Sequence, residues 1–156
     1  MRITIVAVGS KMPSWIEQGV TEYGKRMPPE LKLRWREVPM ERRGKTASAA
    51  QLRVREGERI LRLLPASDRV IALEVEGQRL TTARLAQQLT NWQMSGDNYS
   101  FLIGGPDGLS AECLERAHLR WSLSDLTLPH PLVRVLLAEQ LYRAWTITIN
   151  HPYHRD

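Results

Sequence analysis

Short apolar segments alternate with longer amphipathic segments along the whole chain, and this alternation restricts the fold more than any other feature. Residues 3–9, ITIVAVG, form a β-branched run that ends in glycine, which is typical of a buried strand. The segments RVIALEV (69–75) and YSFLIGG (99–105) have the same character. Residues 31–38, LKLRWREV, alternate apolar with mostly basic side chains, which predicts a strand with one basic, exposed face.

Helices are predicted between and after these strands. One follows Pro13, and a second covers about residues 47–64. Another places Leu85, Leu89 and Trp92 on one stripe. Ser110 is the expected N-cap of a further short helix, because its hydroxyl can accept a hydrogen bond from the first turn.

The last predicted element is a helix over about residues 132–149. Pro131 suits its first turn, where a backbone N–H lacks an intrahelical partner in any case. The helix carries a broad apolar stripe, which is expected to face the core or, in part, a second subunit. Its members are Val133, Leu136, Leu137, Leu141, Ala144 and Trp145.

Strands that alternate with helices in a chain of 156 residues predict a single α/β domain, residues 1–156, with a mainly parallel sheet. Hydrophobic residues make up 42% and charged residues 25%, as in a folded globular protein. We expect no membrane span and no secretory signal, because the apolar runs are short. Cys113 is the single cysteine, which excludes an internal disulfide and favours a reducing, cytoplasmic location.

Positive charge is concentrated in one part of the chain. The formal net charge is +5, and residues 25–62 contain twelve Lys or Arg but only five Asp or Glu. This basic segment includes MERRGK, residues 40–45. Such clustering predicts a polyanionic partner, above all nucleic acid, with a solvated basic surface as the alternative.

Ligands of parallel sheets bind at the carboxyl ends of the strands. Three segments are expected there: the one after Leu73, the glycine loop GGPDG (residues 104–108), and LSDLTLPHP, residues 123–131. Gly104 and Gly105 would let the backbone approach a ligand closely, although a plain turn explains them equally well. The glycine loop matches neither a Walker A loop nor the dinucleotide fingerprint.

The segment before the last helix combines apolar walls with polar atoms. Its leucines can pack against a flat ligand, while its backbone and polar side chains can bracket a purine edge. Pro129 and Pro131 fix the direction of His130, which is more often a structural histidine than a catalyst. The part of this segment that we call the leucine loop consists of Leu123, Ser124, Asp125, Leu126, Thr127 and Leu128.

No metal site is expected. His151 and His154 are three residues apart, but Pro152 between them interrupts the helix that would align them. Neither a cysteine partner nor a His-Glu-x-x-His pattern is present. A serine hydrolase is equally unsupported, because the Gly-x-Ser-x-Gly elbow is absent.

Several of these segments together resemble the RlmH family of SPOUT-class RNA methyltransferases. They are ITIVAVGSKMP, LIGGPDGLS, SLSDLTLPHPLVRVLLAEQLYRAWTI and NHPYHR, so the resemblance covers essentially the whole chain. The least motif-like stretch is roughly residues 40–66. The resemblance implies an S-adenosylmethionine-dependent enzyme that methylates N3 of a pseudouridine in large-subunit (23S) ribosomal RNA. It also implies a homodimer and a deep carboxyl-terminal trefoil knot.

The resemblance further implies which residues form the site. The cofactor contacts are expected from Leu73, Gly104 and the leucine loop, that is, Leu123, Ser124, Asp125, Leu126, Thr127 and Leu128. The substrate is expected to be 23S ribosomal RNA within the ribosome or its large subunit.

Chemistry then gives the tail, residues 150–156, a role. N3 of a uracil ring must lose a proton before it can attack, and a histidine such as His154 can accept that proton. Arg155 can stabilise the negative charge on the ring, Tyr153 can stack on an extruded base, and Arg143 can hold a phosphate or ring oxygen. The alternatives are that Tyr153 only packs, that Arg155 only meets phosphate, that His154 only anchors the tail, and that water is the base.

Two other functions stay open at this point. A non-catalytic RNA-binding or ribosome-associated module would explain the basic segment, but not the glycine and leucine loops. A SPOUT enzyme that acts on transfer RNA would share the cofactor site and differ in its substrate.

Overall fold

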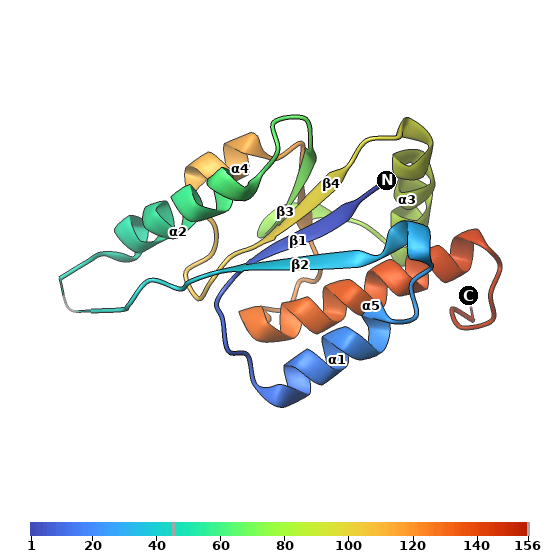
Figure 1. Ribbon diagram of the computed structural model, residues 1–156, viewed down its shortest axis with the longest axis horizontal. Helices are drawn as coiled ribbons and strands as arrows, with labels where there is room; N and C mark the ends of the chain where they lie inside the picture. Colours follow the sequence, from blue (N-terminus) through green and yellow to red (C-terminus); the bar gives the residue numbers. More distant parts are fainter. Residues whose placement is uncertain (45, 156) are drawn as a thin grey trace.

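The computed structural model describes residues 1–44 and 46–155, arranged as a sheet between two layers of helices (Figure 1). The five strands are all paired in parallel, in the order β2-β1-β4-β3-β5. Their bounds are β1 Ile3–Val8, β2 Leu33–Val38, β3 Arg69–Arg79, β4 Tyr99–Ile103 and β5 Leu119–Ser122. The predicted α/β class with a mainly parallel sheet is confirmed.

Helices cover both faces of this sheet. In Figure 1, α2 and α4 lie on one face, while α1, α3 and α5 lie on the other. The helices are α1 Ser14–Gly24, α2 Ala49–Leu63, α3 Thr82–Ser95, α4 Ala111–Arg116 and α5 His130–Thr148, with a short 3₁₀ helix, η1, at Pro29–Leu31. Among the described residues, none of the helices combines the length and apolarity that crossing a membrane requires.

The apolar run of β1 is continuous because both of its faces are buried. Ile3 and Ile5 face the core shared with α3 and α5. Val6 and Val8 face the core shared with α2 and α4. A strand with successive side chains in two different cores needs an apolar residue at almost every position, which is the pattern found in residues 3–8.

The predicted helix signals have structural counterparts. The Ser110 hydroxyl accepts a hydrogen bond from the Cys113 amide at 3.2 Å and caps α4, as predicted.

The last helix, α5, begins at His130, two residues earlier than expected. Arg134 attaches this helix to β1, because its Nη2 atom donates to the carbonyl oxygens of Val8 (3.2 Å) and Gly9 (2.8 Å).

Two features of the sheet differ from the prediction. The strand β5 was not predicted, and β3 continues past residue 75 to Arg79. Pairing between β3 and β5 shifts register between Leu73 and Gln78. Leu73 was expected at the end of its strand. It lies instead at an irregularity within the strand. The implied trefoil knot and the assignment of all 156 residues to one domain stay predictions.

Candidate active site

A pocket of about 150 Å³ lies where the three predicted segments meet at one edge of the sheet. Most of the residues expected to hold a cofactor line it: Leu73, Gly104, Leu123, Ser124, Leu126 and Leu128. Asp125 instead forms an ion pair with Arg79. Thr127 lines a neighbouring cavity, together with Arg53 and Leu114. The sequence therefore predicted correctly which segments form the pocket, but not every residue that lines it.

The glycine loop turns back on itself next to this pocket. The Gly108 amide donates to the Gly105 carbonyl oxygen at 3.0 Å, and Gly108 has φ of +83°, a conformation that favours glycine. A Cβ atom on Gly104 would lie 2.6 Å from the Gly108 carbonyl carbon. A Cβ atom on Gly105 would meet Val8 at 3.0 Å and Glu56 at 3.4 Å. The loop's own backbone therefore leaves no room for a side chain at Gly104, and Val8 and Glu56 crowd one at Gly105. Close approach of a ligand to these two glycines stays a prediction.

Two buried nitrogen atoms near the pocket lack partners. Trp121 and His130 both line it, and neither Trp121 Nε1 nor His130 Nδ1 has a hydrogen-bond partner among residues 1–44 and 46–155. Burial, aided by Arg134 and Arg43, lowers the pKa of His130 and favours the neutral imidazole. Buried polar atoms normally find a partner, so both nitrogens are suited to a polar ligand. Sequence reasoning missed Trp121 because it missed β5, and it had treated His130 as structural.

The lining of this pocket combines the two kinds of surface that a purine nucleoside needs. The side chains of Leu73, Leu123, Leu126 and Leu128 form apolar walls, against which a flat ring can pack. Backbone groups of the two loops and the two unpartnered nitrogens supply polar atoms for the ring edge. An adenosine-containing cofactor such as S-adenosylmethionine has a flat ring for the apolar walls and polar ring-edge atoms for the polar groups.

The tail folds back onto the carboxyl-terminal half of α5. The Tyr153 hydroxyl donates to Glu139 Oε2 at 2.7 Å, and Arg143 Nε donates to the same oxygen at 3.0 Å. The Arg143 guanidinium lies 4.8 Å from the centre of the Tyr153 ring. Burial and the Glu139 carboxylate raise the pKa of Tyr153, which keeps its hydroxyl protonated. His154 is half-buried and Arg155 is exposed.

The tail and the pocket of one chain lie at different places along α5. The pocket contacts this helix at His130 and Val133, whereas the tail contacts Glu139 and Arg143. Along the helix, Glu139 lies six residues and Arg143 ten residues beyond Val133, which corresponds to about 9 and 15 Å. Figure 1 shows the chain end near the carboxyl end of α5, away from where that helix begins. The structure thus brings Arg143 and Tyr153 together but does not bring them to the pocket of their own chain.

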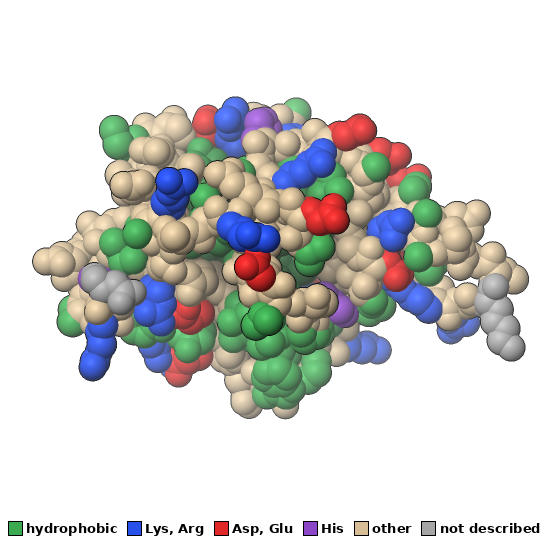
Figure 2. Space-filling model, turned by 180° about the vertical axis from the view of Figure 1, so that it is seen from behind, with side chains coloured by type: hydrophobic (Ala, Val, Ile, Leu, Met, Phe, Trp, Pro, Cys, Tyr) green, Lys and Arg blue, Asp and Glu red, His purple; other side chains and the backbone are tan. Residues whose placement is uncertain are grey.

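The basic segment is only partly available to a partner. Arg34 and Arg36 on β2 and Arg42 beyond it are exposed, but Arg43 forms ion pairs with acidic side chains. Lys45 lies outside the described residues. On the face drawn in Figure 2, Lys and Arg side chains are interspersed with Asp and Glu, while hydrophobic side chains gather at the lower edge.

No group of three His, Cys, Asp or Glu side chains within the described part of the chain is placed to hold a metal ion.

In open parallel α/β sheets, ligands bind outside the carboxyl ends of the strands, which is where this pocket lies. A family model described as "Predicted SPOUT methyltransferase" matches residues 1–154, and the chain belongs to this family.

Two curated relatives share the full length of the chain. It is 59% identical over 156 residues, all of both chains, to "Ribosomal RNA large subunit methyltransferase H" of Hahella chejuensis (strain KCTC 2396). It is 52% identical over 155 residues to the protein of the same name from Marinomonas sp. (strain MWYL1). This match covers 99% of the present chain and 100% of the Marinomonas protein.

A solved structure from Legionella pneumophila, determined in complex with the bound cofactor SAM, has a similar fold. The TM-score is 0.50 and the sequence identity 10%. The match covers 93% of this chain and 66% of the Legionella chain.

Proposed function

We propose that this protein transfers a methyl group from S-adenosylmethionine to N3 of a pseudouridine in large-subunit (23S) ribosomal RNA. The observation that carries the proposal is 59% identity, over the whole of both chains, to a protein named as a ribosomal RNA large subunit methyltransferase. Membership of the SPOUT methyltransferase family supports the reaction type. The pseudouridine and its N3 atom follow from the resemblance to the RlmH family.

The cofactor is assigned to the pocket between the glycine and leucine loops. Leu73 and the leucines of the leucine loop pack against its adenosine part, while Trp121 Nε1 and His130 Nδ1 face its polar atoms. A neutral His130 suits this position, because a positive charge there would repel the sulfonium group. When bound, S-adenosylmethionine supplies the methyl group.

The tail is assigned to the nucleotide. His154 accepts the proton that leaves N3, and Arg155 stabilises the negative charge left on the ring. Tyr153 stacks on the base, and Arg143 holds a phosphate or a ring oxygen. Contact with RNA must then draw Tyr153 and Arg143 away from Glu139, where they pack in the free chain.

We assign the two halves of the site to different protomers of a homodimer. One chain's tail contacts α5 six to ten residues beyond the part of the helix that lines its own pocket, and in this assignment a complete site takes its pocket from one protomer and its tail from the other. Exposed hydrophobic surface supports such a dimer. Trp15 on α1 has 59% of its surface exposed, and the apolar group in Figure 2 lies at the lower edge, where α1 runs in Figure 1.

The remaining basic side chains are assigned to RNA phosphates. Arg34, Arg36 and Arg42 are exposed on β2 and just after it. The proposed substrate is an assembled ribosome or its large subunit, which places the protein in the cytoplasm.

Isothermal calorimetry with S-adenosylhomocysteine, the product form of the cofactor, tests the pocket assignment. We expect binding, and loss of binding in Leu128→Arg, which puts a long charged side chain into an apolar wall. Failure of the wild-type protein to bind would favour the non-catalytic RNA-binding module. Binding accompanied by methylation of transfer RNA, and not of ribosomes, would favour the other SPOUT activity.

A further inference from the structure

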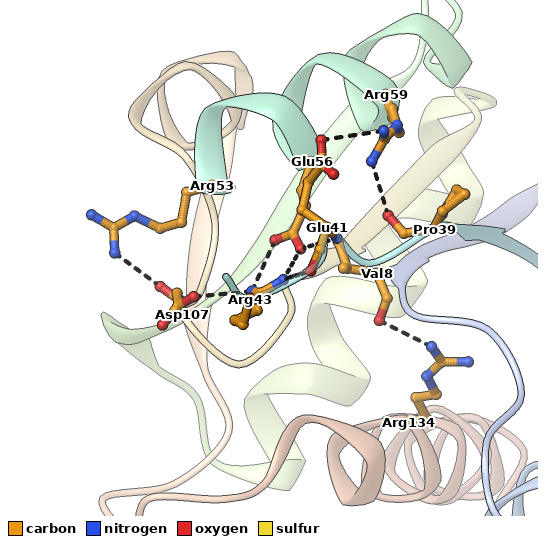
Figure 3. Close-up of polar contacts among 9 residues, drawn as sticks. All are labelled: Val8, Pro39, Glu41, Arg43, Arg53, Glu56, Arg59, Asp107 and Arg134. Atoms are coloured by element: carbon orange, nitrogen blue, oxygen red, sulfur yellow. Dashed lines mark hydrogen bonds and ion pairs between the residues drawn. The ribbon is translucent and has the colours of Figure 1, made fainter. Parts of the chain in front are cut away.

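A buried carboxylate joins helix α2 to the basic segment. Glu56 has only 1% of its surface exposed. Its Oε2 atom accepts hydrogen bonds from the Glu41 amide at 2.9 Å and from Arg43 Nη1 at 2.5 Å. Arg43 Nη1 also donates to the Glu41 carbonyl oxygen at 2.7 Å. Residues 41–43 are thereby fixed against α2, and Figure 3 shows Arg43 directed between α2 and the glycine loop.

The same arginine reaches the glycine loop. Arg43 Nη2 donates to Asp107 Oδ2 at 3.0 Å, and Arg53 Nη1 donates to the Asp107 carbonyl oxygen at 3.3 Å (Figure 3). The side chains of Arg43 and Asp107 are 30% and 29% exposed. Their ion pair is therefore less screened by water than a pair on the open surface. Hydrogen bonding to Glu56 raises the pKa of Arg43, which keeps the bridging cation charged.

The glycine loop lies between this network and the pocket. Gly104, Gly105 and Gly108 line the pocket, while a Cβ atom on Gly105 would point to Glu56 and, at 3.6 Å, to Arg43. Three glycines in five residues give the loop many alternative conformations. The contacts of Arg43 and Arg53 to Asp107 restrict the loop from the side of α2.

We propose that Arg43, Glu56 and Asp107 are positioning residues, which hold the glycine loop in the conformation that binds the cofactor. None of them is assigned a contact with the cofactor: they act through the loop. Arg43 belongs to the basic segment for which a polyanionic partner is expected, but in the folded chain its guanidinium is engaged by two carboxylates. This inference rests on the proposed function in one respect, namely that the ligand of the pocket is S-adenosylmethionine.

The sharpest test is Asp107→Ala, because it releases the loop and leaves the ion pair between Arg43 and the buried Glu56 intact. Calorimetry with S-adenosylhomocysteine should show affinity about tenfold weaker, as expected when the competent loop conformation falls to about a tenth of the population. Asp107→Glu keeps the carboxylate and should recover most of the affinity. Asp97→Ala, a matched change at an exposed aspartate in another loop, should bind as the wild type does. At saturating cofactor, the methylation rate of Asp107→Ala should approach that of the wild type.

The outcomes separate this inference from the proposed function. If the wild type does not bind S-adenosylhomocysteine, the proposed function fails. If the wild type and Asp107→Ala bind it equally tightly, the positioning role is refuted. Should Asp107→Ala fail to fold, the double variant Arg43→Gln, Glu56→Gln replaces it, since the buried Glu56 charge is then not left without its partner. Unchanged affinity in that variant would likewise overturn the proposal.

Discussion

The His118 side chain joins the start of β5 to β3 by a hydrogen bond that depends on its protonation. Its Nδ1 atom accepts from the Val70 amide at 3.0 Å, while the His118 amide donates to the Val70 carbonyl oxygen at 2.7 Å. Burial, together with the charges of Arg69 and Arg116, lowers the pKa of His118. The folded chain therefore holds this imidazole neutral.

This arrangement predicts a loss of stability in acid. An unfolded histidine has a pKa of about 6.5, so the contribution of His118 is complete above that pH and declines as the pH falls toward the folded value. His130, whose pKa is lowered too, acts in the same direction. Thermal melts between pH 7.5 and 5 should show a smaller decrease for His118→Gln, which keeps an acceptor that does not titrate. An identical decrease in both proteins would contradict this role for His118.

Gly104 should be intolerant of any side chain. A Cβ atom would lie 2.6 Å from backbone carbon and 2.8 Å from backbone oxygen of Gly108. We therefore expect Gly104→Ala to lower the free energy of unfolding by about 1–3 kcal/mol, as overpacking does, and to weaken S-adenosylhomocysteine binding. Gly24→Ala is the control, because nothing lies within 4 Å of its Cβ position. Denaturant titration of both variants checks this, and full stability of Gly104→Ala would show that the loop can move away.

At the scale of elements, sequence reasoning succeeded where burial leaves a periodic signal. Strands β1 and β4 were predicted from continuous apolar runs, and their residues are almost all buried. Strand β5 has only four residues with an exposed Arg120, too few to show a period. The second half of β3 is polar and mostly exposed, and its Gly77 resembles a turn residue. That glycine is instead required because a Cβ atom would lie 2.7 Å from the backbone of Arg120.

The segments that form the candidate site could be predicted from the sequence, but several of its individual residues could not. Its segments follow strands in the sequence, and parallel strands bring such segments together at one edge. Trp121 and the network of Arg43, Glu56 and Asp107 depend on contacts between residues far apart in the chain. The position of the tail beside Glu139 is also a tertiary contact. No local pattern encodes these three features.

The tail should be dispensable for folding and required for methyl transfer. Removal of residues 151–156 leaves the whole of α5, which ends at Thr148, and both loops of the pocket. Cofactor binding and dimer formation should therefore survive, while single-turnover methylation falls by orders of magnitude. Point changes at Tyr153 and His154 should be milder and not additive, because groups that act as a unit do not contribute independently. Methylation at the wild-type rate by the shortened protein would refute the tail's role.

Mixed dimers test whether the two protomers share a site. One subunit lacks the tail, and the other carries Leu128→Arg in its pocket. If a tail serves its partner's pocket, the mixed dimer keeps one intact site and is more active than either homodimer. Activity no higher than that of the two homodimers would indicate that each chain uses its own tail.

At the scale of the whole molecule, the proposed site requires two chains. A single chain has a mass of 17.9 kDa, and light scattering at micromolar concentration should report about twice that mass. Replacing exposed Trp15 by a charged residue should shift the equilibrium toward monomer, because charge disfavours burial in an apolar interface. A wild-type monomer under these conditions would contradict the shared site.

The central claim is tested most directly by locating the methyl group. The protein is incubated with S-adenosylmethionine labelled in the methyl group and with either intact ribosomes or transfer RNA from cells that lack this activity. The RNA is then digested to nucleosides and analysed by mass spectrometry. The account predicts N3-methylpseudouridine in 23S RNA from the ribosome sample and no label in transfer RNA. Label in transfer RNA, or on a different nucleoside of 23S RNA, would contradict it.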